Sequence, residues 1–309
     1  MNDKGGRMKV GLHSITYAGI FYRGPGLSLE EVIERAADMG YEGVEVVGKA
    51  PVCSPLDYDE VRAKKARELA EGKGVELPFF AAYVDLNRPE SLDREKELVF
   101  ARESIRLARD LGCKYIRIYS GGDHIYPGAT LWDQWDWTVE ALKKLLPVAR
   151  DCGVGIALEV HTGVAQNVDA IEAMMRQVGW DELYICLDAP LLALREEPVG
   201  GSVRRFSGKI VHSHVTDFVY LPPMVRYSDF RGLALERLPR VHLVPLGEGV
   251  VPTEEFIRAC KEAGFEGYFA YEVCTPFHVD FRPPTIEDVD RLARHAVKWL
   301  KAKRKEIYG

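Results

Sequence analysis

Residues 154–161 (VGIALEVH) and 183–189 (LYICLDA) are two short aliphatic runs, and each carries an ionisable residue near its C-terminal end. An amphipathic segment separates them. Alternation of short buried runs with helical patterns predicts βα units and a parallel sheet. The alternation continues in both directions and predicts strands at 9–15, 43–48, 75–83, 114–120, 154–161, 183–189, 209–216 and 267–274.

Eight strand–helix units in 309 residues match the size of one α/β (β/α)₈ barrel, the TIM barrel, which has about 250 residues plus insertions. No Pro/Gly/Ser-rich linker divides the chain. We therefore expect a single barrel domain over residues 8–309, after a polar, disordered lead-in over residues 1–7. A doubly wound open sheet would need a Gly-rich phosphate-binding turn after an early strand, and no G-x-G-x-x-G motif is present there.

Helix boundaries are marked by capping residues. Ser28 with Glu31 forms a capping-box pattern, and Gly40 follows the apolar periodicity as a stop. Thr285 and Asp288 suggest the start of a last helix. Helices are expected at 90–111, at about 253–264 and from Thr285 to about residue 303, with long loops at 121–133 and 218–248.

Bulk composition excludes several classes of protein. With 41 basic and 47 acidic residues the net charge is −6, and no Lys/Arg run suggests nucleic-acid binding. No apolar stretch reaches the roughly 20 residues of a membrane helix, and the N-terminus lacks the apolar core of a signal peptide. We expect a cytoplasmic protein. Its cysteines, which lack a C-x-x-C motif, are expected to be reduced: Cys53, Cys113, Cys152, Cys186, Cys260 and Cys274.

Four consecutive predicted strands each carry a potential metal ligand near the C-terminal end. They are Glu159, Asp188, His214 and Glu272. Charged groups inside apolar runs are costly to bury unless they are paired or metal-bound. Barrel enzymes also place their active sites at the C-terminal ends of the strands. Three carboxylates with one imidazole favour one Mn²⁺ or Mg²⁺ ion, with Co²⁺ or Zn²⁺ as alternatives.

Other polar residues near the strand ends are candidates for contacting substrate or for orienting a metal ligand. His212 and His214 share a face because side chains repeat every two residues, and His214 lies nearer the mouth. Asp217 is a candidate to orient His214, or else a loop cap. Arg117 is expected either in the site or as an ion-pair partner in the core. The full set is His161, Asp217, His13, Glu45, His212 and Glu248.

The chain resembles the sugar phosphate isomerase/epimerase superfamily, the xylose isomerase-like barrels, from about Lys9 to Leu300. The resemblance implies that Glu159, Asp188, His214 and Glu272 bind the metal. It also implies that Glu159 and Glu272 act as acid/base groups, as in ketose epimerases. The motifs that carry it are Gly40-Tyr41-Glu42-Gly43-Val44-Glu45, Leu158-Glu159-Val160-His161, Leu187-Asp188, Val211-His212-Ser213-His214-Val215-Thr216-Asp217, Leu246-Gly247-Glu248-Gly249, Gly264-Phe265-Glu266-Gly267 and Tyr271-Glu272.

Three positions depart from patterns common in that superfamily. Leu191 stands where many relatives have a histidine after the strand-6 aspartate. Tyr220 stands at the arginine position of ketose 3-epimerases, and Thr216 replaces a common lysine. These departures favour a bulkier substrate than a free ketohexose.

The favoured function is a metal-dependent isomerase or epimerase of a keto sugar or keto-polyol. It would remove the proton next to the carbonyl and form a metal-stabilised enediolate. The alternative within the superfamily is a lyase or dehydratase acting on an inosose, keto sugar or 3-keto glycoside, including cleavage of C-glycosides. A phosphodiesterase or abasic-site endonuclease, and a metal-free sugar-binding subunit, are further alternatives. We expect a small sugar-derived substrate, no nucleic-acid or membrane partner, and a homo-oligomer or partner subunit as an open option.

Overall fold

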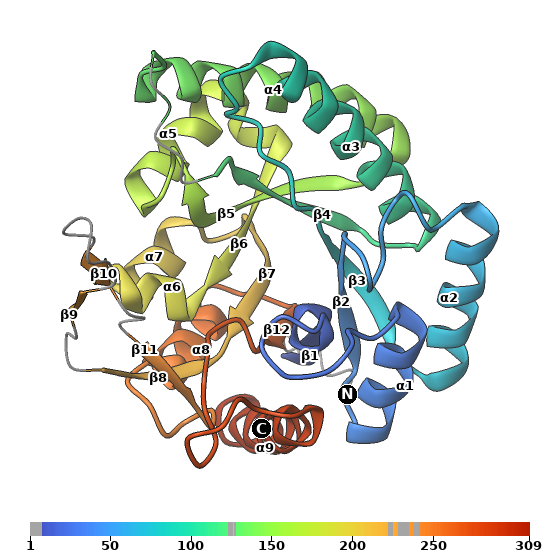
Figure 1. Cartoon of the computed structure of the whole chain (residues 1–309), viewed down its shortest axis with the longest axis vertical. Coiled ribbons are helices and arrows are strands. Elements are labelled where there is room, and N and C mark those ends of the chain that lie inside the picture. Colours follow the sequence, from blue (N-terminus) through green and yellow to red (C-terminus); the bar gives the residue numbers. More distant parts are fainter. Residues whose placement is uncertain (1–7, 123–125, 127, 222–224, 228–234, 238–240) are drawn as a thin grey trace.

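A computed structural model describes residues 8–122, 126, 128–221, 225–227, 235–237 and 241–309. The expected lead-in over residues 1–7 lies outside the described residues. Eight parallel strands close into a barrel, in the order β1-β12-β7-β6-β5-β4-β3-β2 (Figure 1). The predicted (β/α)₈ fold is therefore confirmed. The barrel strands are β1 (Lys9–His13), β2 (Gly43–Val47), β3 (Glu76–Ala81), β4 (Tyr115–Ser120), β5 (Gly155–Gly163), β6 (Leu183–Asp188), β7 (Ile210–Val215) and β12 (Tyr268–Tyr271).

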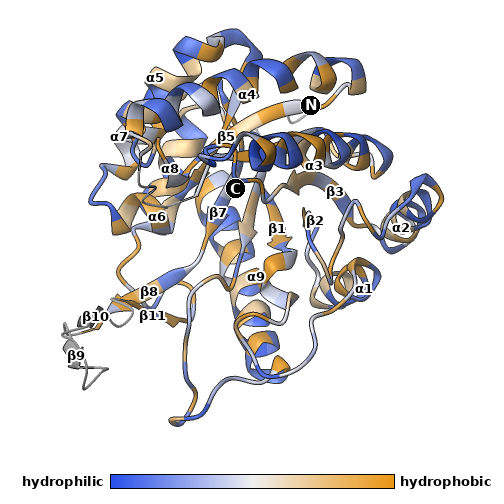
Figure 2. Cartoon of the chain, turned by 45° about the horizontal axis from the view of Figure 1, so that its top comes forward, coloured by the Kyte–Doolittle hydropathy of each residue, from blue (hydrophilic) through white to orange (hydrophobic). Residues whose placement is uncertain are grey.

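Helices surround the barrel and carry their apolar residues on the side that packs against the strands (Figures 1 and 2). The predicted cap at Ser28 is present: its side chain accepts from the Glu31 amide, and Gly40 ends the helix at φ 86°. The helices are α1 (Leu29–Met39), α2 (Glu60–Lys73), α3 (Ser91–Asp110), α4 (Leu131–Cys152), α5 (Val168–Val178), α6 (Ala189–Leu194), α7 (Val199–Arg205), α8 (Thr253–Glu262) and α9 (Ile286–Tyr308), with 3₁₀ turns at Ser14–Tyr17 and Trp180–Glu182.

The segment 218–248, which we expected to be a loop, carries strands. β8 (Asp217–Tyr220) pairs antiparallel with β11 (Val241–Val244), and β9 (Val225–Tyr227) pairs with β10 (Leu235–Arg237). The pairing of β8 with β11 buries Phe218 and Leu243, a stabilisation that depends on residues about 25 positions apart along the chain. Part of the expected loop at 121–133 lies outside the described residues.

Strand register brings the predicted ligands to the same level of the barrel. Asp188 on β6 pairs with His214 on β7, and His214 pairs with Ala270 on β12. Glu159 on β5 pairs with Cys186, two residues before Asp188. The barrel interior beside and beneath these residues is filled by Phe79, Ala157 and Cys186, so it is a packed core rather than a channel.

Two further expectations concern the cysteines and the membrane. All six cysteines are free in the structure. Within the described part of the chain, no helix combines the length and the apolar character needed to cross a membrane.

Candidate functional site

The four predicted metal ligands are buried at the C-terminal mouth of the barrel. Glu159 and His214 are 0% exposed, Asp188 is 2% exposed and Glu272 is 5% exposed. Glu159 lies within β5, Asp188 ends β6, His214 lies in β7 and Glu272 follows β12 directly. Because parallel strands end at the same edge, the sheet itself brings these four side chains together.

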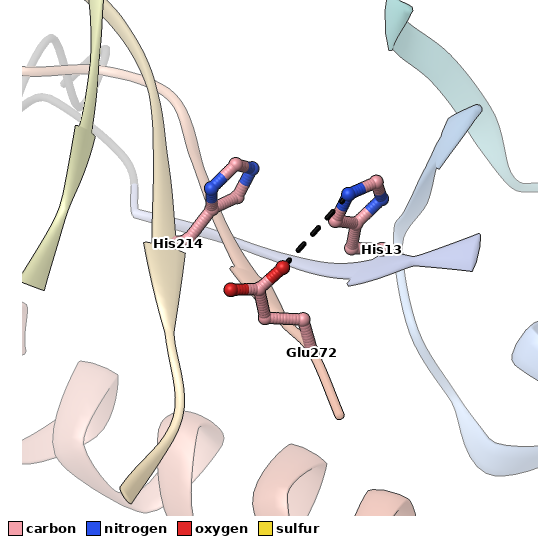
Figure 3. A group of neighbouring side chains, drawn as sticks. All are labelled: His13, His214 and Glu272. Carbon is pink, nitrogen blue, oxygen red and sulfur yellow. Dashed lines mark ion pairs between the residues drawn. The ribbon is translucent and has the colours of Figure 1, made fainter. Parts of the chain in front are cut away.

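The imidazole of His214 lies at the centre of this group. Its Nδ1 is 2.8 Å from Glu159 Oε1 and 3.5 Å from Asp188 Oδ2. Glu272 approaches from the side of β12, and one oxygen of its carboxylate lies within 4.8 Å of ring nitrogens of both His214 and His13 (Figure 3). Three carboxylates therefore converge on one imidazole.

This donor set fits a divalent cation. The other oxygen of Asp188, Oδ1, accepts a hydrogen bond of 2.6 Å from the Leu191 amide, which leaves Oδ2 facing His214 and Glu159. Carboxylate oxygens and an imidazole nitrogen that face one another in a buried place are the ligands of Mn²⁺ and Mg²⁺ sites. His214 belongs to all three clusters of potential ligands among the described residues: with His13 and Glu272, with Glu45 and His212, and with Glu159 and Cys186. Binding of an ion by the four predicted residues stays a prediction.

The two glutamates lie in contrasting electrostatic surroundings. Burial would raise the pKa of Glu159, but Arg117 and His214 outweigh it and lower that pKa to about 2. The guanidinium Nη1 of Arg117 lies 3.1 Å from Glu159 Oε2, so Arg117 is the core ion-pair partner that the sequence suggested. Burial raises the pKa of Glu272 to about 8; His214 opposes this shift, and the negative charge of Asp188 adds to it. Two carboxyl groups with such different acidities are suited to opposite acid and base tasks.

A second layer of polar side chains lies beneath His214, deeper in the barrel. Glu45 Oε2 is 2.8 Å from His214 Nε2 and 2.9 Å from His212 Nε2. The ring of His212 stacks on Phe79 at 4.1 Å, and the ring of His13 stacks on His214 at 5.2 Å. Glu45, His212 and His13 do not line the cavity that opens at the mouth of the barrel. They therefore approach the predicted metal ligands from the barrel interior.

The remaining candidates lie in three different places. His161 lines the cavity and stacks on Tyr119 with ring centroids 4.3 Å apart. Asp217 does not contact His214; its carboxylate accepts from the amides of Phe218, Gly247, Gly249 and Val251, which makes it a loop cap. Glu248 is exposed in the turn that Asp217 holds.

A cavity of about 560 Å³ opens above the four predicted metal ligands. Its size falls within the range of small-molecule sites. Glu159, His161, Asp188 and Glu272 reach it from one side, together with an apolar surface formed by Pro190, Leu191, Leu194, Phe218 and Val241. A hollow of about 620 Å³ lies at the opposite end of the barrel, beside Lys9, Glu76 and Tyr268, far from these residues in the sheet.

The cavity also contains residues that the sequence did not single out. Lys49, Tyr83, Tyr119 and Cys274 line it, and the thiol of Cys274 donates to Glu272 Oε1 at 3.0 Å. Each lies at or just after the end of a barrel strand, and that position was the available signal. Their polar character alone does not distinguish them from ordinary loop residues.

Known proteins with similar sequences and structures act on sugars and inososes. The fructoselysine 3-epimerase of Shigella flexneri is 24% identical over 270 residues, which cover 81% of this chain and 87% of the relative. The inosose dehydratase of Geobacillus thermodenitrificans is 24% identical over 265 residues, 81% of this chain and 83% of the relative. The crystal structure of D-psicose 3-epimerase with D-tagatose from Clostridium cellulolyticum H10 superposes with a TM-score of 0.72 at 18% identity, covering 96% of this chain and 99% of that chain.

The family model for the xylose isomerase-like TIM barrel matches residues 33–303, which is most of the chain. This range includes seven of the eight barrel strands and all four predicted ligands. The sequence, the closed barrel and the polar group at its mouth agree with this match. The chain belongs to the xylose isomerase-like TIM barrel family.

Proposed function

We propose that this protein is a divalent-metal-dependent isomerase or epimerase of a keto sugar or keto-polyol, acting by removal of the proton next to the carbonyl through an enediolate. One observation carries the proposal: Glu159 and Glu272 both line the cavity, and Asp188 and His214 lie between their strands in the barrel order. The 3-epimerases among the relatives support the same reaction class.

Glu159, Asp188, His214 and Glu272 would hold the ion, with Mn²⁺ or Mg²⁺ favoured by the oxygen-rich donor set. A bound divalent ion supplies Lewis acidity, which stabilises negative charge on substrate oxygens during proton removal. Asp188 is tied to the Leu191 amide through one oxygen, and His214 is held by Glu45. These two residues are therefore suited to holding the ion rather than to moving protons.

The proton transfers fall to the two glutamates. One carboxylate removes the proton from the carbon beside the carbonyl, and the other returns it on another face or atom. Arg117 keeps Glu159 ionised, whereas burial, with the negative charge of Asp188, raises the pKa of Glu272. Both glutamates are buried, and burial strengthens these electrostatic effects.

A lyase or dehydratase is the second candidate function, and the cavity surface favours it. Leu191, which stands where the family resemblance implies a histidine, lines the cavity with Pro190 and Leu194. This apolar surface suits a bulkier substrate than a free ketohexose. The first half-reaction would be the same, with a β-leaving group departing after proton removal. The inosose dehydratase among the relatives supports this alternative.

A screen for solvent deuterium uptake tests the proposal. Keto sugars, inososes and 3-keto glycosides are incubated in D₂O with the protein and Mn²⁺ or Mg²⁺, with a chelator-treated control. Metal-dependent uptake at the carbon beside the carbonyl is expected, since it reports the proton removal that both candidates share. A product whose molecular formula is unchanged apart from the deuterium identifies an isomerase or epimerase. A product that has lost water or an aglycone identifies a lyase. No uptake by any compound with metal bound would contradict both.

A further inference from the structure

One wall of the cavity carries two cations. Lys49 follows β2, and Arg117 lies in β4. Both approach the ring of Tyr83: Lys49 Nζ is 3.9 Å from the ring centroid, and the guanidinium carbon of Arg117 is 5.1 Å from it. The same guanidinium lies 4.3 Å from the centroid of Tyr119. We call these four residues, which all line the cavity, the cationic wall: Lys49, Tyr83, Arg117 and Tyr119.

The cations of this wall are incompletely paired. Among the described residues, no carboxylate forms an ion pair with Lys49, although the residue is half-buried. Arg117 is 2% exposed, and its one ion pair with another described residue joins Nη1 to Glu159. Within the described part of the chain, Arg117 Nε and Nη2 have no hydrogen-bond partner. Buried donors without acceptors are energetically costly, so an acceptor is expected from outside the chain.

Proximity of the two cations adds to this cost. Burial lowers the pKa of Lys49, and the positive charge of Arg117 lowers it further. An anionic ligand between them would reverse both effects by supplying opposite charge and hydrogen-bond acceptors. Arg195, another cation near the cavity, already donates to the His161 and Leu191 carbonyls and is thus accounted for within the fold.

The arrangement of charges across the cavity is asymmetric. The cationic wall comes from β2, β3 and β4, which are neighbours in the barrel, or from the loops that follow them. Asp188 and Glu272 belong to the other half, at β6 and after β12. Arg117 touches Glu159, so an anionic group bound at this wall would lie beside the glutamate that is proposed to act on the substrate.

We propose that the cationic wall binds an anionic substituent of the substrate, a carboxylate or a phosphate, with Lys49 and Arg117 as its partners. This inference rests on the proposed function and narrows its substrate class from keto sugars in general to keto-sugar acids or keto-sugar phosphates. The two groups share negatively charged oxygens, which accept hydrogen bonds from ammonium and guanidinium donors. The aromatic rings of Tyr83 and Tyr119 would form the surface behind the bound group.

The test compares binding of three compounds to the metal-loaded protein: D-fructose, D-fructose 6-phosphate and 5-keto-D-gluconate. Titration calorimetry is expected to show that at least one of the two anionic compounds binds tenfold or more tightly than D-fructose. The one that does so identifies phosphate or carboxylate as the group recognised. Charge-assisted hydrogen bonds contribute about 1.5–3 kcal/mol, which corresponds to roughly 10–100-fold in affinity.

Variants at Lys49 test whether the cationic wall causes the preference for anionic compounds over D-fructose. Lys49→Met keeps the aliphatic stem without the charge and should reduce the preference for the anionic compound over D-fructose at least tenfold. Lys49→Arg should restore much of it, and Lys144→Met, on the exposed face of α4, is the matched control. The inference would be overturned if the wild type bound both anionic compounds no more tightly than D-fructose, or too weakly to measure. It would also be overturned if the preference for an anionic compound survived Lys49→Met.

The outcome remains distinct from that of the proposed function. Deuterium uptake by neutral keto sugars without any preference for anions would support the function and overturn the anion site. A Lys49-dependent preference for anions without metal-dependent uptake by any compound would support the anion site and contradict the proposed reaction. Both measurements use the same metal-loaded full chain, so neither result depends on a difference in sample.

Discussion

His214 Nε2 lies 2.8 Å from Glu45 Oε2, although the two residues belong to strands that are not neighbours in the barrel. This contact across the barrel orients the imidazole of His214. With Nε2 held by Glu45, Nδ1 is the ring nitrogen that faces Glu159 and Asp188. Partners of this kind raise the basicity of a ligating imidazole and hold its ring in place.

Replacement of Glu45 should therefore weaken metal binding without touching a ligand. We expect Glu45→Gln to lower the affinity for Mn²⁺ about 10–100-fold, the usual effect of losing such a partner. Titration calorimetry on metal-free protein measures this affinity. Glu248→Gln, in an exposed turn, is the matched control and should bind Mn²⁺ like the wild type. Equal affinity in both variants would show that Glu45 does not orient His214.

Replacement of the predicted ligands themselves should weaken metal binding directly. Purified protein is expected to hold about one divalent ion per chain, and a chelator should abolish activity. Asp188→Ala and His214→Ala should each weaken binding by an order of magnitude or more, because each removes one ligand. Elemental analysis with titration calorimetry measures both quantities. Full metal occupancy in both variants would refute the proposed ligand set.

Asp217 is expected to act on stability rather than on metal binding. Its two oxygens accept from four backbone amides of the β8 and 247–251 segments. Asp217→Asn removes one of these oxygens, and two hydrogen bonds to a charged group together contribute about 3 kcal/mol. Urea unfolding should show a loss near that size with Mn²⁺ affinity unchanged. Asp181→Asn, whose side chain is 99% exposed, should change stability by less than about 0.5 kcal/mol. A stable Asp217→Asn variant with weakened Mn²⁺ binding would instead place Asp217 in the site.

The cap of α9 should stabilise the protein in a pH-dependent way. Asp288 accepts from the Thr285 amide at 2.8 Å and pairs with Arg282 and Arg291, and the bond from Arg282 is the main cause of its lowered pKa. A lowered folded-state pKa gives a contribution that is complete above the unfolded value of about 3.9 and is lost as the pH falls below it. Asp288→Asn should cost about 1–2 kcal/mol at pH 7 and less at pH 3. A cost that is the same at both pH values in urea unfolding would contradict this linkage.

Much of the architecture could be predicted because it depends on local patterns. The buried parallel strands are short aliphatic runs, and Ser28 and Thr285 mark helix starts within four residues of sequence. The pairing of β8 with β11 could not be predicted, because it depends on contacts between residues about 25 positions apart. For the same reason the sequence suggested Asp217 beside His214, whereas the structure brings Glu45 there across the barrel.

The same distinction between local patterns and long-range contacts applies to the site. Glu159, Asp188 and His214 could be singled out because charged residues near the ends of apolar strands stand out in the sequence. Lys49 and Tyr83 lie in loops after β2 and β3, where polar residues are ordinary. Only the closed barrel shows that Lys49 Nζ lies over the ring of Tyr83 and that both line the same cavity as Glu159.

The last prediction concerns the two glutamates of the cavity. Glu159→Gln and Glu272→Gln each keep the size of the side chain and one ligand oxygen but remove the basic carboxylate. Each should retain much of the metal and lose at least about 100-fold in rate, the usual scale of acid/base catalysis. Turnover is measured on the substrate found in the deuterium screen, with metal content determined in parallel.

The two variants should then differ in isotope exchange. The variant that lacks the base should stop exchanging the proton beside the carbonyl, whereas the other should still exchange it without forming product. Among the described residues, Glu159 contacts both Arg117 and His214, whereas the Glu272 carboxylate accepts one side-chain hydrogen bond, from Cys274, and lies 3.8 Å from His13. The Glu272 side chain is therefore less constrained and better able to transfer a proton between substrate and solvent. Turnover of both variants near the wild-type rate with metal bound would assign the acid/base roles elsewhere, and His161, which lines the same cavity, would be the first candidate.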